Sequence, residues 1–283
     1  MVCKITFGII CGMAVPATLL LLGSLALAQS PTKLSNIEVC NGTDRTAAQL
    51  QIDACTAIIN TEDETPGVLS IAYNNRGNAY VVKGDYDRAI EDYGQSLKLN
   101  PAYAKPLNNR GIVYYKKRDY DRAIKDFDEA IKLNPHYANA YANRAEAYQK
   151  KNEFNRAIQD YDEAIRFEPN LDTVWNGRCW VRAIVGDLQA ALTDCNTALR
   201  LKANDPATYD SRGLVYLKMG QPDPAIADYT AALRIQPNLA TAYYGRGLAK
   251  LKKGDSAASN ADMAAAKAID PKITEEFARY AVQ

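Results

Sequence analysis

The sequence predicts an all-α solenoid assembled from repeated helical hairpins. The first observation is a strict period, because an arginine recurs every 34 residues and an aspartate recurs with the same spacing. A fixed period of about 20 to 50 residues indicates stacked structural repeats. The arginines are Arg76, Arg110, Arg144, Arg178, Arg212 and Arg246, and the aspartates are Asp92, Asp126, Asp160, Asp194, Asp228 and Asp262.

The second observation is the helical spacing of apolar and small residues within each unit. In the first unit, Tyr73, Gly77 and Tyr80 share one face of a first helix, and Ala89 and Tyr93 share one face of a second helix. The small residues allow the two helices to approach closely, and the rings fill the space around the contact. Each unit is therefore predicted to be a helical hairpin.

The third observation is the punctuation between helices. Gly84 lies between the two helices of the first unit, where a left-handed stop suits glycine, and a proline such as Pro101 closes most units. Arg118 and Asn152 replace the hinge glycine in the next two units, and Ala203 replaces a closing proline.

This pattern resembles the tetratricopeptide repeat family, in which aromatic, small and aromatic positions are followed by alanine, an aromatic residue and a closing proline. The resemblance implies a right-handed superhelical solenoid of six helix-turn-helix units. It also implies a protein-interaction module, and with the Asn-Arg-Gly run at 75–77 the chain looks like exported proteins of Gram-negative bacteria. The units are 70–103, 104–137, 138–171, 172–205, 206–239 and 240–273.

Both ends of the array depart from the repeat. Residues 29–69 are interpreted as an N-terminal cap or partial repeat, in which 46–60 looks like a second helix. Residues 273–283 are expected to form a C-terminal capping helix, because four residues there share one stripe. Those residues are Ile273, Phe277, Tyr280 and Ala281.

The first 28 residues have the form of a secretory signal. Lys4 precedes an apolar run, and the small-residue pattern Ala26-Leu27-Ala28 ends it. Pro16 interrupts the run, which is long for a signal core, so an uncleaved N-terminal anchor is the alternative. We expect the chain to be exported, with the bacterial periplasm as its compartment.

Four cysteines remain after the signal, in two local pairs. The pairs Cys40–Cys55 and Cys179–Cys195 are separated by 15 and 16 residues. An oxidising compartment favours two disulfides, and four buried thiols are the alternative. Zinc is disfavoured, because neither pair has the short spacing of a metal knuckle.

Composition argues against several classes of function. Lysine and arginine total 34 and aspartate and glutamate total 33, so no overall positive charge exists to hold nucleic acid or an anionic membrane. His136 is the only histidine, and it lies in a junction between units. No phosphate loop, nucleophile motif, metal site or cofactor site is predicted, and the chain is not expected to be an enzyme.

The repeated arginines and aspartates are interpreted as structural pairs that join helices, with a binding ladder as the alternative. An arginine fork matches a carboxylate geometrically, so an equal period in both residue types favours direct pairing. Arg144→Ala is therefore expected to lower thermal stability.

The resemblance implies that the first helices line a concave groove. The first three units place asparagines there, and an amide offers both donors and an acceptor to the backbone of an extended peptide. The later units place apolar residues there instead. The expected groove residues are Asn74, Asn75, Asn78, Asn108, Asn109, Asn139 and Asn143, followed by Trp180, Leu214, Tyr244 and Leu248.

We therefore expect a module that binds an extended protein segment whose identity the sequence does not give. Two alternatives remain for the groove: the asparagines form solvated surface, or the apolar half packs against the capping helix or a second copy. A self-associating assembly factor of the envelope is the alternative function, and an enzyme is a more distant one.

Overall fold

The computed structural model describes residues 33–42 and 47–280, and these residues form helices and no strand. Their helices are α1 (Lys33–Cys40), α2 (Ala48–Ile59), α3 (Pro66–Lys83), α4 (Tyr86–Leu99), α5 (Ala104–Lys116), α6 (Tyr120–Leu133), α7 (Ala138–Lys150), α8 (Phe154–Phe167), α9 (Asp172–Val185), α10 (Leu188–Leu201), α11 (Pro206–Lys218), α12 (Pro222–Ile235), α13 (Ala240–Lys252), α14 (Ser256–Ile269) and α15 (Ile273–Arg279). The all-α prediction is confirmed.

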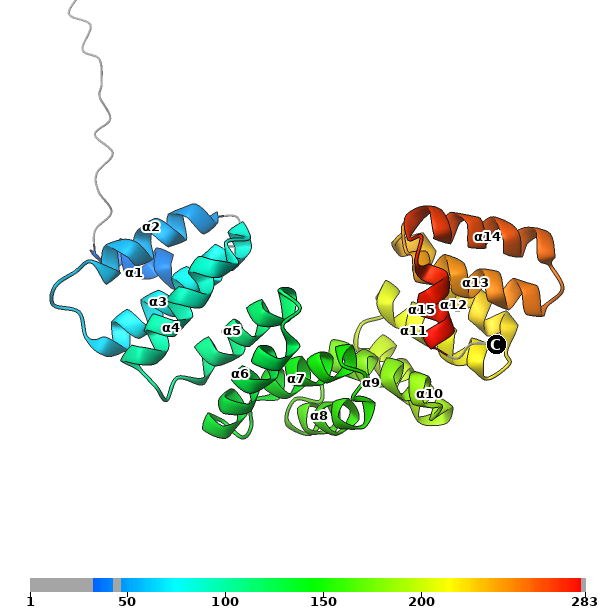
Figure 1. Ribbon diagram of the computed structural model, residues 1–283, viewed down its shortest axis with the longest axis horizontal. Helices are drawn as coiled ribbons and strands as arrows, with labels where there is room; N and C mark the ends of the chain where they lie inside the picture. The colour runs from blue at the N-terminus through cyan, green and yellow to red at the C-terminus, as the bar shows by residue number, and fades with distance from the viewer. Residues whose placement is uncertain (1–32, 43–46, 281–283) are drawn as a thin grey trace, which may run out of the picture.

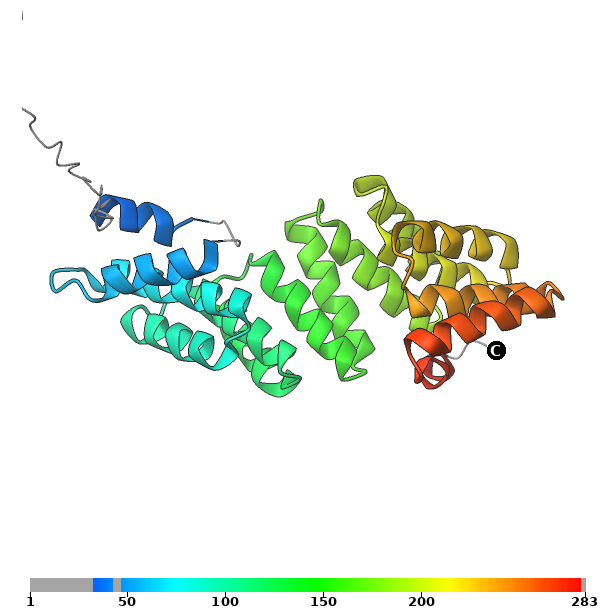
Figure 2. The ribbon, with the colours of Figure 1, turned by 90° about the horizontal axis from the view of Figure 1, so that it is seen from above.

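The helices form hairpins that stack in chain order, from α3–α4 to α13–α14. Figure 1 shows the stack curving into an arch, and Figure 2 shows its elongated form from above. The short α15 does not continue the stack but lies on the inner side of the arch (Figure 1). The predicted solenoid with a capping helix is thus confirmed, and the capping helix turns inward.

Four of the six hairpins close around a buried ring from the second helix, whereas Cys195 of α10 and Met263 of α14 replace the ring in the other two. A Cβ atom added to Gly77 would lie 2.8 Å from Cε1 of Tyr93, and one added to Gly111 would lie 2.5 Å from Cε1 of Phe127. Both rings are almost fully buried, at 1% and 0% exposure. The absence of a side chain at these glycines therefore sets the distance between the two helices.

The hinge between the helices is left-handed even where glycine is missing. Gly84 has φ 77°, and Arg118 and Asn152 adopt φ 62° and 61° at the corresponding positions. A residue with a Cβ atom is strained in this conformation, and asparagine tolerates it better than arginine. The repeat geometry overrides local preference at these two hinges.

The periodic arginines and aspartates pair directly, as predicted. Each arginine donates two hydrogen bonds of 2.7 to 2.9 Å, from Nε and one terminal nitrogen, to both oxygens of the aspartate 16 residues later. The arginine lies on the first helix of a unit and the aspartate on the second. The structural interpretation is confirmed, since each pair ties the two helices of one hairpin together.

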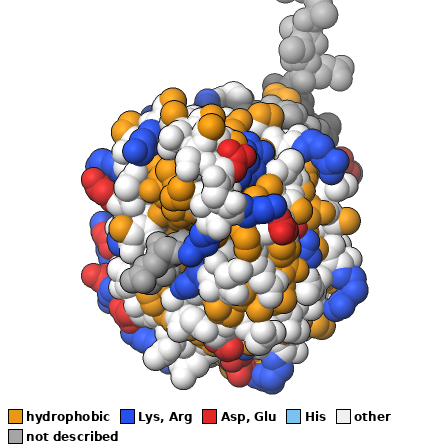
Figure 3. Space-filling view, turned by 90° about the vertical axis from the view of Figure 1, so that its right-hand side faces the viewer, with side chains coloured by type: hydrophobic (Ala, Val, Ile, Leu, Met, Phe, Trp, Pro, Cys, Tyr) orange, Lys and Arg blue, Asp and Glu red, His pale blue; other side chains and the backbone are white. Residues whose placement is uncertain are grey.

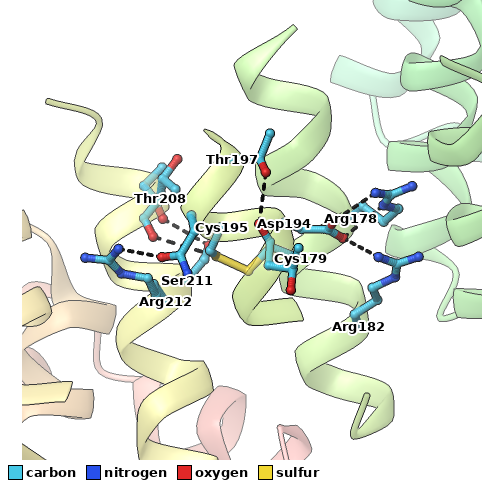
Figure 4. The surroundings of a disulfide bond; sticks show 12 residues. Arg178, Cys179, Arg182, Asp194, Cys195, Thr197, Thr208, Ser211 and Arg212 are labelled. Carbon is cyan, nitrogen blue, oxygen red and sulfur yellow. Dashed lines mark hydrogen bonds and ion pairs between the residues drawn. A yellow bond between two sulfur atoms is a disulfide. The ribbon is translucent and has the colours of Figure 1, made fainter. Parts of the chain in front are cut away.

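Both cysteine pairs lie at bonding distance. The sulfurs of Cys40 and Cys55 are 2.11 Å apart and join α1 to α2, and those of Cys179 and Cys195 are 1.95 Å apart and join α9 to α10. Figure 4 shows the second pair beside Asp194, which accepts hydrogen bonds from both Arg178 and Arg182. A covalent link and a charged cluster therefore hold the same hairpin.

The ends differ from the expectation in two respects. Helix α3 begins at Pro66, before the expected unit boundary at 70, because Thr65 caps the helix by accepting a hydrogen bond from the Val68 N–H. The segment before Cys40 forms the helix α1, which the repeat pattern did not predict. The expected signal at 1–28, and Ala281 of the expected stripe, lie outside the described residues.

Candidate functional site: a concave groove with two different halves

The N-terminal half of the solenoid contains a groove of about 870 Å³. Helices α3 and α5 supply most of its lining, and Asn41 and Gly42, which follow α1, line it as well. The lining combines amide, apolar and cationic side chains. It includes Asn41, Gln51, Asn75, Asn78, Val81, Val82, Lys83, Tyr86, Tyr93, Asn109, Ile112 and Lys116.

The asparagines of the groove are hydrogen-bonded to one another across repeats. Asn75 Nδ2 donates to Asn41 Oδ1 over 2.9 Å, and Asn74 Nδ2 donates to Asn75 Oδ1 over 3.1 Å. Asn109 Nδ2 then donates to both Asn74 Oδ1 and Asn78 Oδ1, over 3.0 and 3.1 Å. The network fixes the orientation of the amides, since the oxygens of Asn41, Asn74, Asn75 and Asn78 each accept from a neighbour and Asn109 Nδ2 donates twice.

Within the residues that the structure describes, the network leaves one polar atom without a hydrogen bond on each of two amides, Asn78 and Asn109. Asn78 accepts at Oδ1 from Tyr93 and Asn109, and its Nδ2 has no hydrogen-bond partner among the described residues. Asn109 donates twice, and its Oδ1 likewise accepts nothing within residues 33–42 and 47–280. A donor and an acceptor therefore lie next to each other in the groove, both held in place by internal bonds.

The remaining expected asparagines occupy three different environments. Asn74 and Asn108 are 3% and 4% exposed and form a layer beneath the groove. Asn143 is half-buried, and its Nδ2 donates to Asn108 Oδ1 over 2.8 Å, which continues the bonding pattern into the third unit. Asn139 is exposed at the start of α7 and does not line the groove.

Cations and apolar side chains stand beside the amides. Lys116 lines the groove and lies 6.0 Å from the Tyr86 ring centroid, and Lys83 Nζ donates to Gln49 Oε1 over 2.5 Å. Val82 is 47% exposed, and Ile112 is half-buried. The N-terminal groove thus offers amide pairing, apolar contact and positive charge together.

The C-terminal half of the concave face has a different character, because α15 covers it. Leu214 and Tyr244 are buried in a cluster with Phe277 of α15, and Trp180 and Leu248 pack against the same cluster. Two of the alternatives for the apolar half were the capping helix and a second copy. The structure places the chain's own capping helix there.

Two residues of this half were not predicted from the sequence. Lys218 on α11 donates from Nζ to the carbonyl oxygens of Ala183, Ile184 and Tyr280. Asp210 occupies the same position in its repeat unit as Asn108 does in the second unit. Burial raises the pKa of Asp210 to about 7, the hydrogen bond from Thr241 lowers it, and the negative charge of Glu276 raises it further. Lys218 shares its repeat position with Lys116, and Asp210 shares its position with the buried asparagines. These shared positions are the sequence signals that could have identified the two residues.

The surface carries both signs of charge in mixture. Figure 3 shows the C-terminal end, where lysine and arginine alternate with aspartate and glutamate around hydrophobic patches. No group of three or more potential metal-ligating side chains occurs in the described part of the chain. Among residues 33–42 and 47–280, no helix has the length and apolar character needed to span a membrane.

The fold and its groove define a helical-repeat protein of the interaction type, and family comparisons agree. A family model described as TPR repeat matches residues 77–118 and 220–254, and one described as tetratricopeptide repeat matches 104–137 and 138–171. Together with the six-unit period, these matches show that the chain belongs to the tetratricopeptide repeat family, whose members are generally non-catalytic interaction scaffolds. No curated protein matches the sequence significantly.

Solved structures share this fold at low sequence identity. The Cut9–Hcn1 hetero-tetramer of the APC/C is 16% identical with a TM-score of 0.69 over 88% of this chain, which spans 51% of that chain. A tetratricopeptide repeat protein from Parabacteroides merdae is 19% identical with a TM-score of 0.66, covering 88% of this chain and 98% of that one. YrrB, described as a TPR protein with an unusual peptide-binding site, is 21% identical with a TM-score of 0.53, covering 67% and 97%.

Proposed function

We propose that this protein is an exported, non-catalytic module that binds an extended segment of a partner protein in its N-terminal groove. The observation that carries the proposal is the pair of unused amide groups, the Asn78 Nδ2 donor and the Asn109 Oδ1 acceptor. An extended backbone presents one N–H and one C=O per residue, so it can satisfy both groups whatever its sequence. The groove therefore selects for an extended backbone conformation rather than for a particular sequence.

The side chains around the amides add a preference for composition. Lys83 and Lys116 supply positive charge within the groove, and Val82 and Ile112 supply apolar surface. A segment with an acidic side chain near an apolar one matches this lining. YrrB, whose structure is described as having an unusual peptide-binding site, offers a parallel for peptide recognition on this fold.

The cysteine pairs support export. The chain has two cysteine pairs at bonding distance, which suits an oxidising compartment such as the periplasm. The Cys40–Cys55 pair also holds α1 against α2, and Asn41 and Gly42, which follow α1, line the groove. Oxidation would therefore favour a complete groove. The self-associating alternative has less support, because α15 already covers the apolar half of the concave face.

The proposal is tested with linear peptides selected from a random phage-displayed library on the oxidised protein. Asn78→Asp keeps an oxygen for the bonds from Tyr93 and Asn109 and replaces the unused donor by a second oxygen. We expect this variant to weaken binding about tenfold, since a neutral donor is lost and a negatively charged acceptor faces the peptide carbonyl. The matched control is Asn139→Asp, which makes the same change at an exposed position outside the groove.

The outcomes are distinct. Weakened binding in Asn78→Asp with unchanged binding in Asn139→Asp supports the groove. Equal affinity in both variants, with circular dichroism showing both folded, would reject the amide groove as the binding site. Selection of no peptide at all would reject binding of extended segments.

A further inference from the structure

Helix α15 occupies the apolar half of the concave face in the manner of a bound segment. It follows α14 in the chain, yet it lies along the inner side of the arch rather than completing another hairpin (Figures 1 and 2). Its contacts reach back across three units, because Tyr280 meets Trp180 on α9. A helix that only capped the last repeat would need to contact α13 and α14 alone.

Two aromatic side chains anchor α15. Phe277 is 4% exposed, and its ring centroid lies 4.8 Å from that of Tyr244. The Tyr280 ring stands edge-on to Trp180 with centroids 5.5 Å apart. Aromatic side chains at a spacing of three residues lie on one face of a helix, and rings buried in pockets dominate the affinity of such contacts.

A single cation holds the end of α15. Lys218 Nζ donates to the Tyr280 carbonyl oxygen over 3.1 Å and to the carbonyl oxygen of Ala183, near the end of α9, over 2.7 Å. An ammonium group has three donors and suits the unpaired carbonyls at the end of a helix. The concave face thus recognises both the side chains of α15 and its C-terminal end.

One part of α15 fits poorly. Asp210 accepts a hydrogen bond from Thr241 at Oδ2, and its buried Oδ1 has no hydrogen-bond partner in the described part of the chain. The charged group of α15 that acts on Asp210 is Glu276, whose negative charge raises the Asp210 pKa further and which accepts a hydrogen bond from Tyr280 Oη. A donor or a cation in the position of Glu276 would pair with the orphan oxygen instead.

We propose that the surface formed by Trp180, Asp210, Leu214, Lys218, Tyr244 and Leu248 receives a short amphipathic helix of a partner protein, and that α15 is its tethered competitor. The partner helix carries two aromatic side chains three positions apart and a basic side chain immediately before the first. This inference does not rest on the function proposed for the N-terminal groove, since the two surfaces share no residue.

The tether sets the strength of the competition. A segment joined by a short linker has an effective concentration in the millimolar range, so a free helix of equal intrinsic affinity is outcompeted. A partner helix that replaces the repulsion between Asp210 and Glu276 by a favourable pairing gains an advantage over α15. The mismatch at Glu276 therefore makes α15 a releasable occupant.

The test uses the full chain carrying Phe277→Ala and Tyr280→Ala, which removes both anchors of α15. The probes are fluorescent peptides of residues 270–280, one with the native sequence and one carrying Glu276→Lys, with Glu275→Lys as the matched control on the exposed side of the helix. We expect the Glu276→Lys peptide to bind the variant about tenfold more tightly than either other peptide, measured by fluorescence anisotropy. We expect the unsubstituted chain to bind it at least about tenfold more weakly than the variant does.

Three results would overturn the inference. The first is binding of no peptide by a variant whose circular dichroism shows it to be folded. The second is equal affinity for the Glu276→Lys and Glu275→Lys peptides. The third is concentration-dependent dimerisation of the unsubstituted chain that the anchor substitutions abolish, because the occupant would then be α15 of a second copy. Loss of binding on adding Trp180→Ala to the variant places the peptide on this surface.

Discussion

The pair between Arg144 and Asp160 is the contact whose loss has the best-defined cost. Arg144→Ala removes two hydrogen bonds of 2.7 Å and leaves a carboxylate whose side chain is 8% exposed without its cation. Removing one partner of a buried ion pair costs about 3–5 kcal/mol, and since the arginine is itself 17% exposed, water can reach the site and we expect about 3 kcal/mol.

Further substitutions at Arg144 and Asp160 separate the contributions of charge, hydrogen-bond geometry and burial to this cost. Arg144 also donates to Asp128 over 2.6 Å, and because Asp128 is 49% exposed this pair adds at most about 1 kcal/mol. Arg144→Lys keeps the charge but loses the two-pronged fork, so its effect should be intermediate. Burial raises the pKa of Asp160, partly offset by Arg144, so adding Asp160→Asn to Arg144→Ala should recover part of the loss.

The assay is urea unfolding followed by circular dichroism, together with hydrogen exchange resolved by helix. Repeat arrays lose cooperativity along their length, so protection should fall most in α7 and α8 and least in α13 and α14. The control is Lys132→Ala, whose pair with Glu129 spans 3.4 Å with side chains 74% and 50% exposed and should contribute less than about 0.5 kcal/mol. If Arg144→Ala had the same urea midpoint as Lys132→Ala, the structural role of the repeated arginine–aspartate pairs would be refuted.

Three further predictions concern strain, packing and pH. Arg118→Gly should stabilise the chain by about 1 kcal/mol in urea unfolding, because it removes a left-handed arginine, and a loss of stability would contradict this. Gly111→Ala should lower the free energy of unfolding by about 1–3 kcal/mol, because the new methyl group meets the buried Phe127 ring, and an unchanged midpoint would count against that packing. Burial raises the pKa of Asp210 from 3.8 to about 7, so the native state binds more protons than the unfolded state and the free energy of unfolding should fall as the pH rises from about 4 to 7. Asp210→Asn should remove this fall, whose upper limit is about 4 kcal/mol. An equal dependence of stability on pH in both proteins from pH 5 to 8 would refute the prediction.

The period made the hairpins and their ion pairs predictable. Arg76 and Asp92 recur in step, and pairing is the simplest arrangement that keeps both residue types at equal spacing. Helix α3 begins before the expected unit boundary at 70, because the period sets the unit length but the Thr65–Pro66 cap sets where the helix begins. Local capping chemistry therefore decided the boundary.

The concave face was only partly predictable. The sequence locates Asn78 and Asn109 on the first helices, but it does not say that they bond to each other across repeats and leave one side free. The stripe of Phe277 and Tyr280 predicts a buried face for the last helix, but not that this face turns back to Trp180 on α9. Both features depend on the curvature of the stack, which brings residues of separate units together and has no signal in a single unit.

Site-specific photo-crosslinking in the native compartment shows whether the N-terminal groove binds a segment of a partner protein. A benzophenone amino acid replaces Ile112 in the N-terminal groove of the full chain, and a second protein carries it at Leu133, which is 40% exposed on α6 and outside the groove. We expect a discrete cross-linked protein from position 112 that is lost when Asn78→Asp is added, with none from position 133. Cross-linking of the same proteins from both positions, or from neither, would contradict the claim that this groove binds a partner segment.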